Sequence, residues 1–190
     1  RNAPLRAPAD NVIMAGELRD QETASLAVRA ALAGRLVLST LHTNDAASGV
    51  TRLLNLGIEP FVLCSTLCGI VSKRLVRVLC RECRAAVELD AGQLAALGLS
   101  LPGAQPHSMP FWRAVGCPRC RGTGYCGRTG VFELLTVDSH IRSLILKRTS
   151  GAQIRQSAIS RGMQSLTFAG WQKMQAGVTS LEELLRVLPS

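Results

Sequence analysis

Aromatic residues and long apolar runs are both scarce in this sequence of 190 residues. Phe, Trp and Tyr make up only 4% of the chain, so a core must be built mainly from Leu, Val, Ile and Ala. No apolar stretch approaches about 20 residues without a charge, which argues against a membrane-spanning helix. The segment Arg1 to Pro4 has no Met and no signal-peptide pattern, and we expect it to be interior to a longer protein.

Acidic residues are also few, with 13 Asp and Glu against 22 Lys and Arg. The resulting net charge of +9 favours an acidic partner. Composition alone does not decide whether that partner is nucleic acid, an anionic membrane or an acidic protein. Hydrophobic residues make up 47% of the chain, which is typical of a packed globular protein.

The first third of the chain alternates between strand and helix patterns. Residues 12–15 and 36–38 are apolar runs typical of strands buried on both faces, and each is followed by a helix pattern, over 22–33 and 46–56. This order predicts an α/β fold with a parallel sheet and right-handed crossovers. Residues 61–79 continue as one long predicted helix.

The pattern changes at Cys80. The sequence predicts loops over 80–126, with a short helical patch at 91–97 and an exposed loop at 103–110, and then a strand at 130–135. The predicted C-terminal helices cover 139–147, 152–161, 166–176 and 181–187, and Ser180 with Glu183 forms a capping box that opens the last one. We therefore predict three parts, which are 1–79, 80–126 and 127–190.

Seven cysteines include two Cys-x-x-Cys pairs, formed by Cys80, Cys83, Cys117 and Cys120. Two such pairs can complete a closed tetrahedral four-sulfur site, so the spacing predicts structural Zn²⁺ without metal catalysis. Redox-active or merely reduced pairs are the alternative. Cys126 is predicted to be a free thiol beside the site. Cys64 and Cys68 are predicted to be small core residues on one apolar helix.

A second chemical pattern lies at the ends of the two predicted strands. The first runs into Glu17 and the second into Ser39, Thr40 and His42. An acid at the carboxyl edge of a parallel sheet can hold Mg²⁺ through water or orient an attacking water. An imidazole there can donate to a phosphate oxygen. Each signal alone is weak, because many buried strands end in an acid and many loops carry a His.

Together these segments resemble the Walker B and His boxes of the type II secretion and type IV pilus ATPases. The resemblance lies in VIMAGELRDQETA (12–24) and GRLVLSTLHTNDA (34–46), and it extends through the cysteine pairs, GTGYCGRTGVFELL (122–135) and the tail (162–187) to the zinc-bearing branch. It implies a RecA-like core, hydrolysis of Mg·ATP, and a homo-hexameric ring. It also implies a cytoplasmic location, peripheral at a bacterial inner membrane, with platform proteins as partners.

Carried over by position, the resemblance makes Glu17 the Walker B acid, His42 the γ-phosphate sensor, Arg19 a family arginine near an acid or phosphate, and the four paired cysteines the Zn²⁺ ligands. The sequence departs from the family in having no Gly-x₄-Gly-Lys-Ser/Thr P-loop and no acidic Asp box before residue 12. We therefore expect this chain alone neither to bind ATP tightly nor to hydrolyse it.

Basic residues recur at three- and four-residue steps and would share one face of the long predicted helix; they are Lys73, Arg74, Arg77, Arg81 and Arg84. This stripe fits an acidic protein or anionic lipid head groups, and it fits a solvated face equally well. The stripe has no interleaved aromatics, which argues against nucleic acid. Two functions besides a type II secretion ATPase stay open, a type IV pilus extension ATPase and a zinc-ribbon binding module without catalysis.

Overall fold

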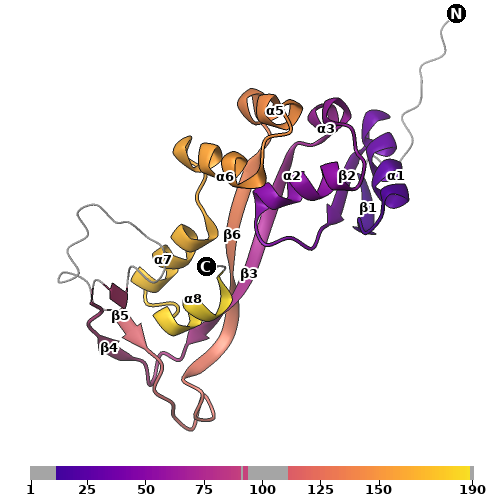
Figure 1. The fold of residues 1–190 in the computed structure, drawn as a ribbon. Coiled ribbons are helices and arrows are strands. Elements are labelled where there is room, and N and C mark those ends of the chain that lie inside the picture. Colours follow the sequence, from indigo (N-terminus) through magenta and orange to yellow (C-terminus); the bar gives the residue numbers. More distant parts are fainter. Residues whose placement is uncertain (1–11, 91, 94–110, 189–190) are drawn as a thin grey trace, which may run out of the picture. The chain divides into compact units, whose positions relative to one another are not determined.

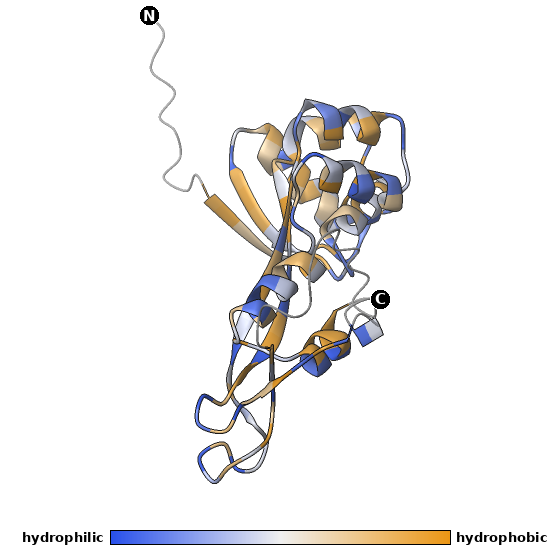
Figure 2. Ribbon diagram, turned by 90° about the vertical axis from the view of Figure 1, so that its left-hand side faces the viewer, coloured by the Kyte–Doolittle hydropathy of each residue, from blue (hydrophilic) through white to orange (hydrophobic). Residues whose placement is uncertain are grey.

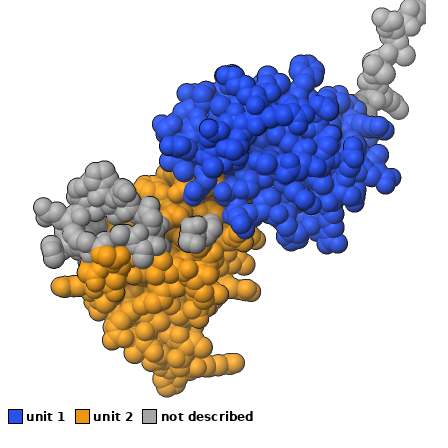
Figure 3. Space-filling view, viewed as in Figure 1, with its two compact units in different colours: residues 1–70, 135–161 blue, residues 71–134, 162–190 orange. Residues whose placement is uncertain are grey.

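The chain divides into two compact units, each built from two separate stretches of sequence (Figure 3). Unit 1 contains Arg1–Ile70 and Leu135–Arg161, and unit 2 contains Val71–Leu134 and Gly162–Ser190. The structure, a computed structural model, describes residues 12–90, 92–93 and 111–188. Most of the predicted patch at 91–97 and loop at 103–110 lies outside the described residues. The three-part division of the sequence stays a prediction.

Unit 1 contains the predicted parallel strand pair with its connecting helix (Figure 1). Asp20 and Asp45 act as N-caps, accepting hydrogen bonds from the N–H groups of Thr23 and Ser48, and they start the two helices that follow the strands. The elements of this unit are β1 (Val12–Glu17), α1 (Gln21–Leu32), β2 (Leu36–Thr40), α2 (Ala46–Asn55), α3 (Pro60–Thr66), α5 (Ser139–Leu146) and α6 (Gly151–Ser160).

One face of the β1–β2 pair is apolar and exposed, which corrects the prediction of strands buried on both faces. Val12 pairs with Leu36 and Met14 with Leu38, so these four side chains lie on the same face, and each is between 49% and 74% exposed. The strands are correspondingly coloured as hydrophobic in Figure 2. The described part of the chain leaves this face uncovered. The apolar runs therefore predicted the two strands correctly, but they did not show which faces of the strands are buried.

The long helix predicted over 61–79 is wrong. The helix α3 ends at Thr66, Leu67 has an extended backbone, and β3 (Gly69–Leu79) follows. Val71, Val76 and Val78 favour a strand, and β3 is stabilised by pairing with β6, a partner about 60 residues away in sequence. Local periodicity could not reveal that partner.

Unit 2 is built around the paired strands β3 and β6 (Tyr125–Thr136), of which residues 71–79 and 125–134 belong to this unit. The strand β4 (Ala85–Val87) pairs antiparallel with β5 (Phe111–Arg113), and the helices are α7 (Leu166–Gln175) and α8 (Leu181–Val187). The core of the unit is aliphatic with two aromatic rings, and it comprises Val76, Leu89, Phe111, Val131, Leu166, Trp171, Met174, Leu181, Leu184 and Leu188.

The C-terminal helix prediction is confirmed within a residue or two for α5, α6, α7 and α8. The capping box is half confirmed, because Ser180 accepts from the Glu183 N–H while the Glu183 carboxylate bonds Arg77 and Arg186 instead of the cap. Among the described residues, no helix has the length and apolar character needed to cross a bilayer.

Candidate nucleotide half-site and metal centre

Glu17 is the last residue of β1 and lies at the carboxyl edge of the parallel pair. The ladder continues past it, because the Leu18 N–H donates to the Thr40 carbonyl at 3.1 Å. The Thr40 hydroxyl donates to the Gly16 carbonyl at 2.7 Å, across a shift in register between Met14 and Glu17. The irregularity therefore occurs directly before the acid, and β2 fixes the backbone on both sides of it.

Both oxygens of the Glu17 carboxylate have a donor. His42 Nε2 lies 3.1 Å from Oε1, and Arg19 Nε donates to Oε2 at 2.6 Å. The Glu17 side chain is only 20% exposed, whereas His42 is 88% and Arg19 is 76% exposed. The structure thus brings together the three residues selected from the sequence, with the acid underneath and two basic side chains open to solvent.

The loop that carries His42 leads directly into α2. Thr43 donates its hydroxyl hydrogen to the Asp45 carbonyl at 3.1 Å, and the Asp45 carboxylate accepts from the Ser48 N–H at 2.6 Å. The other Asp45 oxygen lies 3.9 Å from Arg155 Nε on α6. These contacts fix the start of α2 three residues after His42.

An acid with two exposed basic neighbours can act on an anionic substrate. A carboxylate can accept a proton from water or bind a hydrated cation, while guanidinium and imidazole groups donate to phosphate oxygens. The carboxyl edge of a parallel sheet is the usual location of such a ligand.

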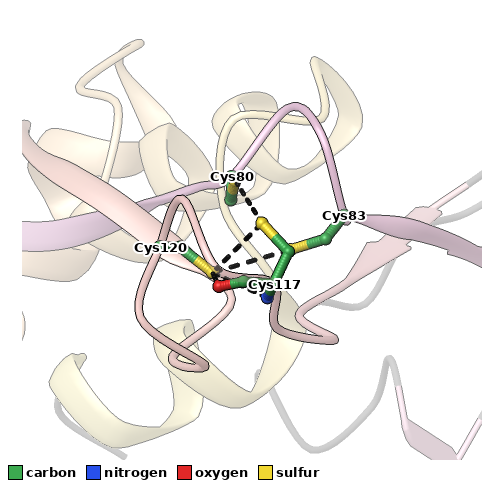
Figure 4. Close-up of side chains that lie close together, drawn as sticks. All are labelled: Cys80, Cys83, Cys117 and Cys120. Carbon is green, nitrogen blue, oxygen red and sulfur yellow. Dashed lines mark hydrogen bonds between the residues drawn. The ribbon is translucent and has the colours of Figure 1, made fainter.

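The second site is a cluster of four cysteines in unit 2 (Figure 4). Their four sulfur atoms lie within 4.8 Å of one another, and three of the sulfur–sulfur distances are 3.9 Å (Cys80–Cys117), 3.8 Å (Cys83–Cys120) and 3.7 Å (Cys117–Cys120). A tetrahedral centre with metal–sulfur distances of about 2.3 Å has sulfur–sulfur edges of about 3.8 Å. The spacing of the sulfurs therefore fits a four-coordinate Zn²⁺.

Backbone donors favour negative charge in this cluster. Burial raises the pKa of the Cys120 thiol, but the N–H groups of Cys117 and Gly124, each 3.2 Å from its sulfur, outweigh burial and bring that pKa to about 6. Burial and the neighbouring thiols raise the pKa of Cys83 to about 12 despite the Gly116 N–H. The Glu82 N–H lowers the pKa of Cys80 as well, so Cys80 and Cys120 are prepared to ionise, whereas ionising Cys83 too requires a cation among the sulfurs.

The other three cysteines, Cys64, Cys68 and Cys126, are not among the four of the cluster. Cys126 is exposed and its side chain bonds that of Cys80, which fits the predicted thiol beside the cluster. Cys64 is buried on α3, whereas Cys68 is exposed and lies beyond the end of that helix. The prediction of two core cysteines on one helix was therefore half wrong.

The predicted basic stripe does not lie on a helix. Its residues lie on β3 and in the segment after it, and at least Arg77 and Arg84 have structural partners. Arg77 bonds Glu183 and stacks on the Tyr125 ring at 3.9 Å, while Arg84 bonds the Gly177 carbonyl and stacks on Trp112 at 4.3 Å. These two arginines support the fold of unit 2.

Sequence reasoning missed one residue at the first site. Arg52, in the last turn of α2, donates from Nη2 to the Arg19 carbonyl at 3.2 Å. The two residues are 33 positions apart, and no local pattern links them.

Comparison with known proteins assigns the chain to a family. The profile of the family described as "Type II/IV secretion system protein" matches residues 2–186. The chain is 45% identical over 179 residues to a type IV pilus assembly ATPase, TfpB of Acinetobacter baylyi, covering 94% of this chain and 30% of TfpB. It is 44% identical over 185 residues to type II secretion system ATPase E of Vibrio cholerae, covering 97% of this chain and 36% of that protein.

Among solved structures, the pilus retraction motor PilT with bound ADP matches with a TM-score of 0.59 and 25% identity, covering 93% of this chain and 39% of PilT. The fold is therefore the α/β fold of the RecA-like ATPases. Within that class, the chain belongs to the type II/IV secretion system protein family. It spans about a third of the length of the two curated relatives.

Proposed function

We propose that the full-length protein carrying this chain hydrolyses Mg·ATP beside Glu17 and His42 and uses the energy for type II protein secretion. The observation that carries the proposal is the pairing of the Glu17 carboxylate with His42 Nε2 at 3.1 Å, at the carboxyl edge of two parallel strands. Membership of a family that contains secretion and pilus ATPases supports it.

In this proposal Glu17 orients a water molecule and accepts its proton, while His42 and Arg19 donate to phosphate oxygens. Bound Mg·ATP would supply the phosphoryl group and the charge of the metal. Each Glu17 oxygen has one basic neighbour, Arg19 Nε at Oε2 and His42 Nε2 at Oε1, and each keeps a second lone pair that can accept from a water molecule. A phosphate is a competing acceptor for both donors, which links its arrival to the release of Glu17.

The test measures steady-state ATP hydrolysis by the full-length protein and compares the Glu17→Gln variant with Glu22→Gln as the control. Glu22 is an exposed acid in the first turn of α1, so it controls for the loss of one charge. We expect Glu17→Gln to lower kcat by about 100-fold or more, as for a lost general base, with ATP still bound. Normal turnover of Glu17→Gln would reject the assignment, and the chain of 190 residues alone is expected to be inactive.

The proposal extends to the metal and the assembly. Cys80, Cys83, Cys117 and Cys120 would hold one structural Zn²⁺, closed to catalysis. By family resemblance, the full-length protein would form a homo-hexamer in the cytoplasm, peripheral at the inner membrane against platform proteins. Exposed Lys73 and Arg81 remain available for anionic lipid head groups.

Assembly of type IV pili is the second candidate, because TfpB is as similar to this chain as the secretion ATPase of Vibrio cholerae. Deletion of the gene in its own bacterium distinguishes the two. Loss of secreted enzymes from the medium with normal pili supports secretion, and loss of surface pili with normal secretion supports pilus assembly.

A further inference from the structure

Three residues connect β1 to α1, and each is anchored by a different element. The Leu18 N–H donates to the Thr40 carbonyl of β2 at 3.1 Å. Asp20 caps α1 by accepting from the Thr23 N–H at 2.8 Å. Between them, the Arg19 carbonyl accepts from Arg52 Nη2 of α2 at 3.2 Å. The orientation of the peptide after Arg19 is therefore set from α2.

The helix α2 also determines where the His42 loop ends. Its N-cap, Asp45, lies three residues after His42, and its buried face includes Val50 at 0% and Leu53 at 5% exposure. One packed helix of ten residues thus reaches both loops that supply donors to Glu17.

A second contact joins the end of α2 to the start of α1. Gly57 has φ +86°, and a Cβ added there would lie 2.9 Å from Gln21 Nε2. The side chain of Gln21, the first residue of α1, therefore lies against the turn that ends α2. The C-terminal end of α2 therefore makes two contacts near Arg19, one with the Arg19 carbonyl and one with the Gln21 side chain.

We propose that Arg52 is a positioning residue for ATP hydrolysis, an inference that rests on the proposed function. By holding the Arg19 carbonyl, Arg52 fixes the backbone from which the Arg19 guanidinium reaches Glu17 Oε2 at 2.6 Å. Without that donor the peptide after Arg19 loses its contact with α2, so the Arg19 guanidinium is held less firmly against Glu17. Misplacement of a catalytic group by about 1 Å can cost 100-fold in rate, so a measurable loss is expected.

A purely structural role predicts a different pattern. A cation in the last turn of a helix stabilises it through the helix dipole, and Arg29 holds the same position in α1. Arg29→Met therefore matches Arg52→Met in charge, size and place within a helix. Arg52→Lys keeps a donor on a flexible stem, so it separates loss of the hydrogen bond from loss of the arginine.

The experiment measures kcat and KM for ATP in the full-length protein and its three variants, together with backbone hydrogen exchange of the segment 17–20. We expect Arg52→Met to lower kcat about tenfold with KM within twofold, and to speed exchange in that segment. Arg29→Met should match the parent in kcat and in exchange, and Arg52→Lys should keep at least half of the parental kcat.

Equal kcat values for Arg52→Met and Arg29→Met would overturn the inference. So would equal impairment of Arg52→Met and Arg52→Lys, because the donor would then not be the feature that matters. Absence of turnover in the parental protein would instead reject the proposed function, so the two failures are distinguishable.

Discussion

Glu183 and Glu17 show how the surroundings of a carboxylate decide its role. The side chain of Glu183 is fully buried and accepts from the Arg77 N–H, the Arg77 side chain and the Arg186 side chain. Burial raises its pKa, but these three donors outweigh burial and bring the pKa of Glu183 to about 2. A carboxylate buried completely beneath its donors is structural, whereas Glu17 is 20% exposed at the carboxyl edge and its two basic neighbours are open to solvent.

Stability of unit 2 should therefore depend on acid pH through Glu183. Because its pKa is lowered from an ordinary 4.5 to about 2, its contribution is complete above pH 4.5 and is lost as pH falls from 4.5 towards 2. The shift corresponds to roughly 3 kcal/mol. Glu183→Gln should lower the free energy of unfolding at pH 7 by about 2–3 kcal/mol. Urea unfolding at pH 7 and pH 3 measures both effects.

The matched control for Glu183 is Glu182→Gln, since Glu182 is an exposed acid in the same first turn of α8. It should leave the urea midpoint nearly unchanged at both pH values. Equal loss of stability in the two variants at pH 7 would contradict the structural role assigned to Glu183.

At the residue scale, Glu17 and His42 were selected because they follow apolar strand patterns, whereas Arg19 was selected only from the resemblance to the family. The sequence did not locate Arg52, nor the Arg77 partner of Glu183, which is 106 positions away. Contacts over such separations depend on how elements pack, and only the folded chain specifies them.

At the scale of elements, the signal that starts a helix is local in the sequence, whereas the signal that pairs distant strands is not. Asp20 and Asp45 each start a helix through a side chain three residues from its partner, so the signal is local. The strand β3 was predicted as a helix because its stabilising partner, β6, lies on the other side of the cysteine-bearing segment. Burial of β1 and β2 was also overestimated, since composition does not show which faces are covered.

The cysteine cluster is the element whose prediction can be tested most simply. We expect about one Zn²⁺ per chain by metal analysis, and removal of Zn²⁺ by a chelator should lower the unfolding temperature by more than about 5 °C. Cys120→Ser should lose the metal, because Cys120 is the thiol best prepared to ionise. Cys126→Ser, which removes the exposed fifth thiol, should keep it. Full Zn²⁺ content in Cys120→Ser would contradict the assignment of the ligands.

At the scale of the whole molecule, the chain corresponds to one part of the longer proteins that it resembles. It spans 30% and 36% of the curated relatives described above, and it contains no P-loop sequence. Parallel sheets are normally covered on both faces, so the exposed apolar face of β1 and β2 fits a covering layer supplied by the full-length protein. Conversion of ATP hydrolysis into movement for secretion therefore belongs to the full-length protein, as proposed.

The most direct test of the shared site is a double-mutant cycle in kcat between Glu17→Gln and His42→Asn in the full-length protein, measured with radiolabelled ATP. Groups that act as one unit give strongly non-additive effects. We predict that the double variant falls no more than about threefold below Glu17→Gln alone. Effects of the two substitutions that multiply, or a His42→Asn variant as active as the parent, would contradict a common catalytic edge.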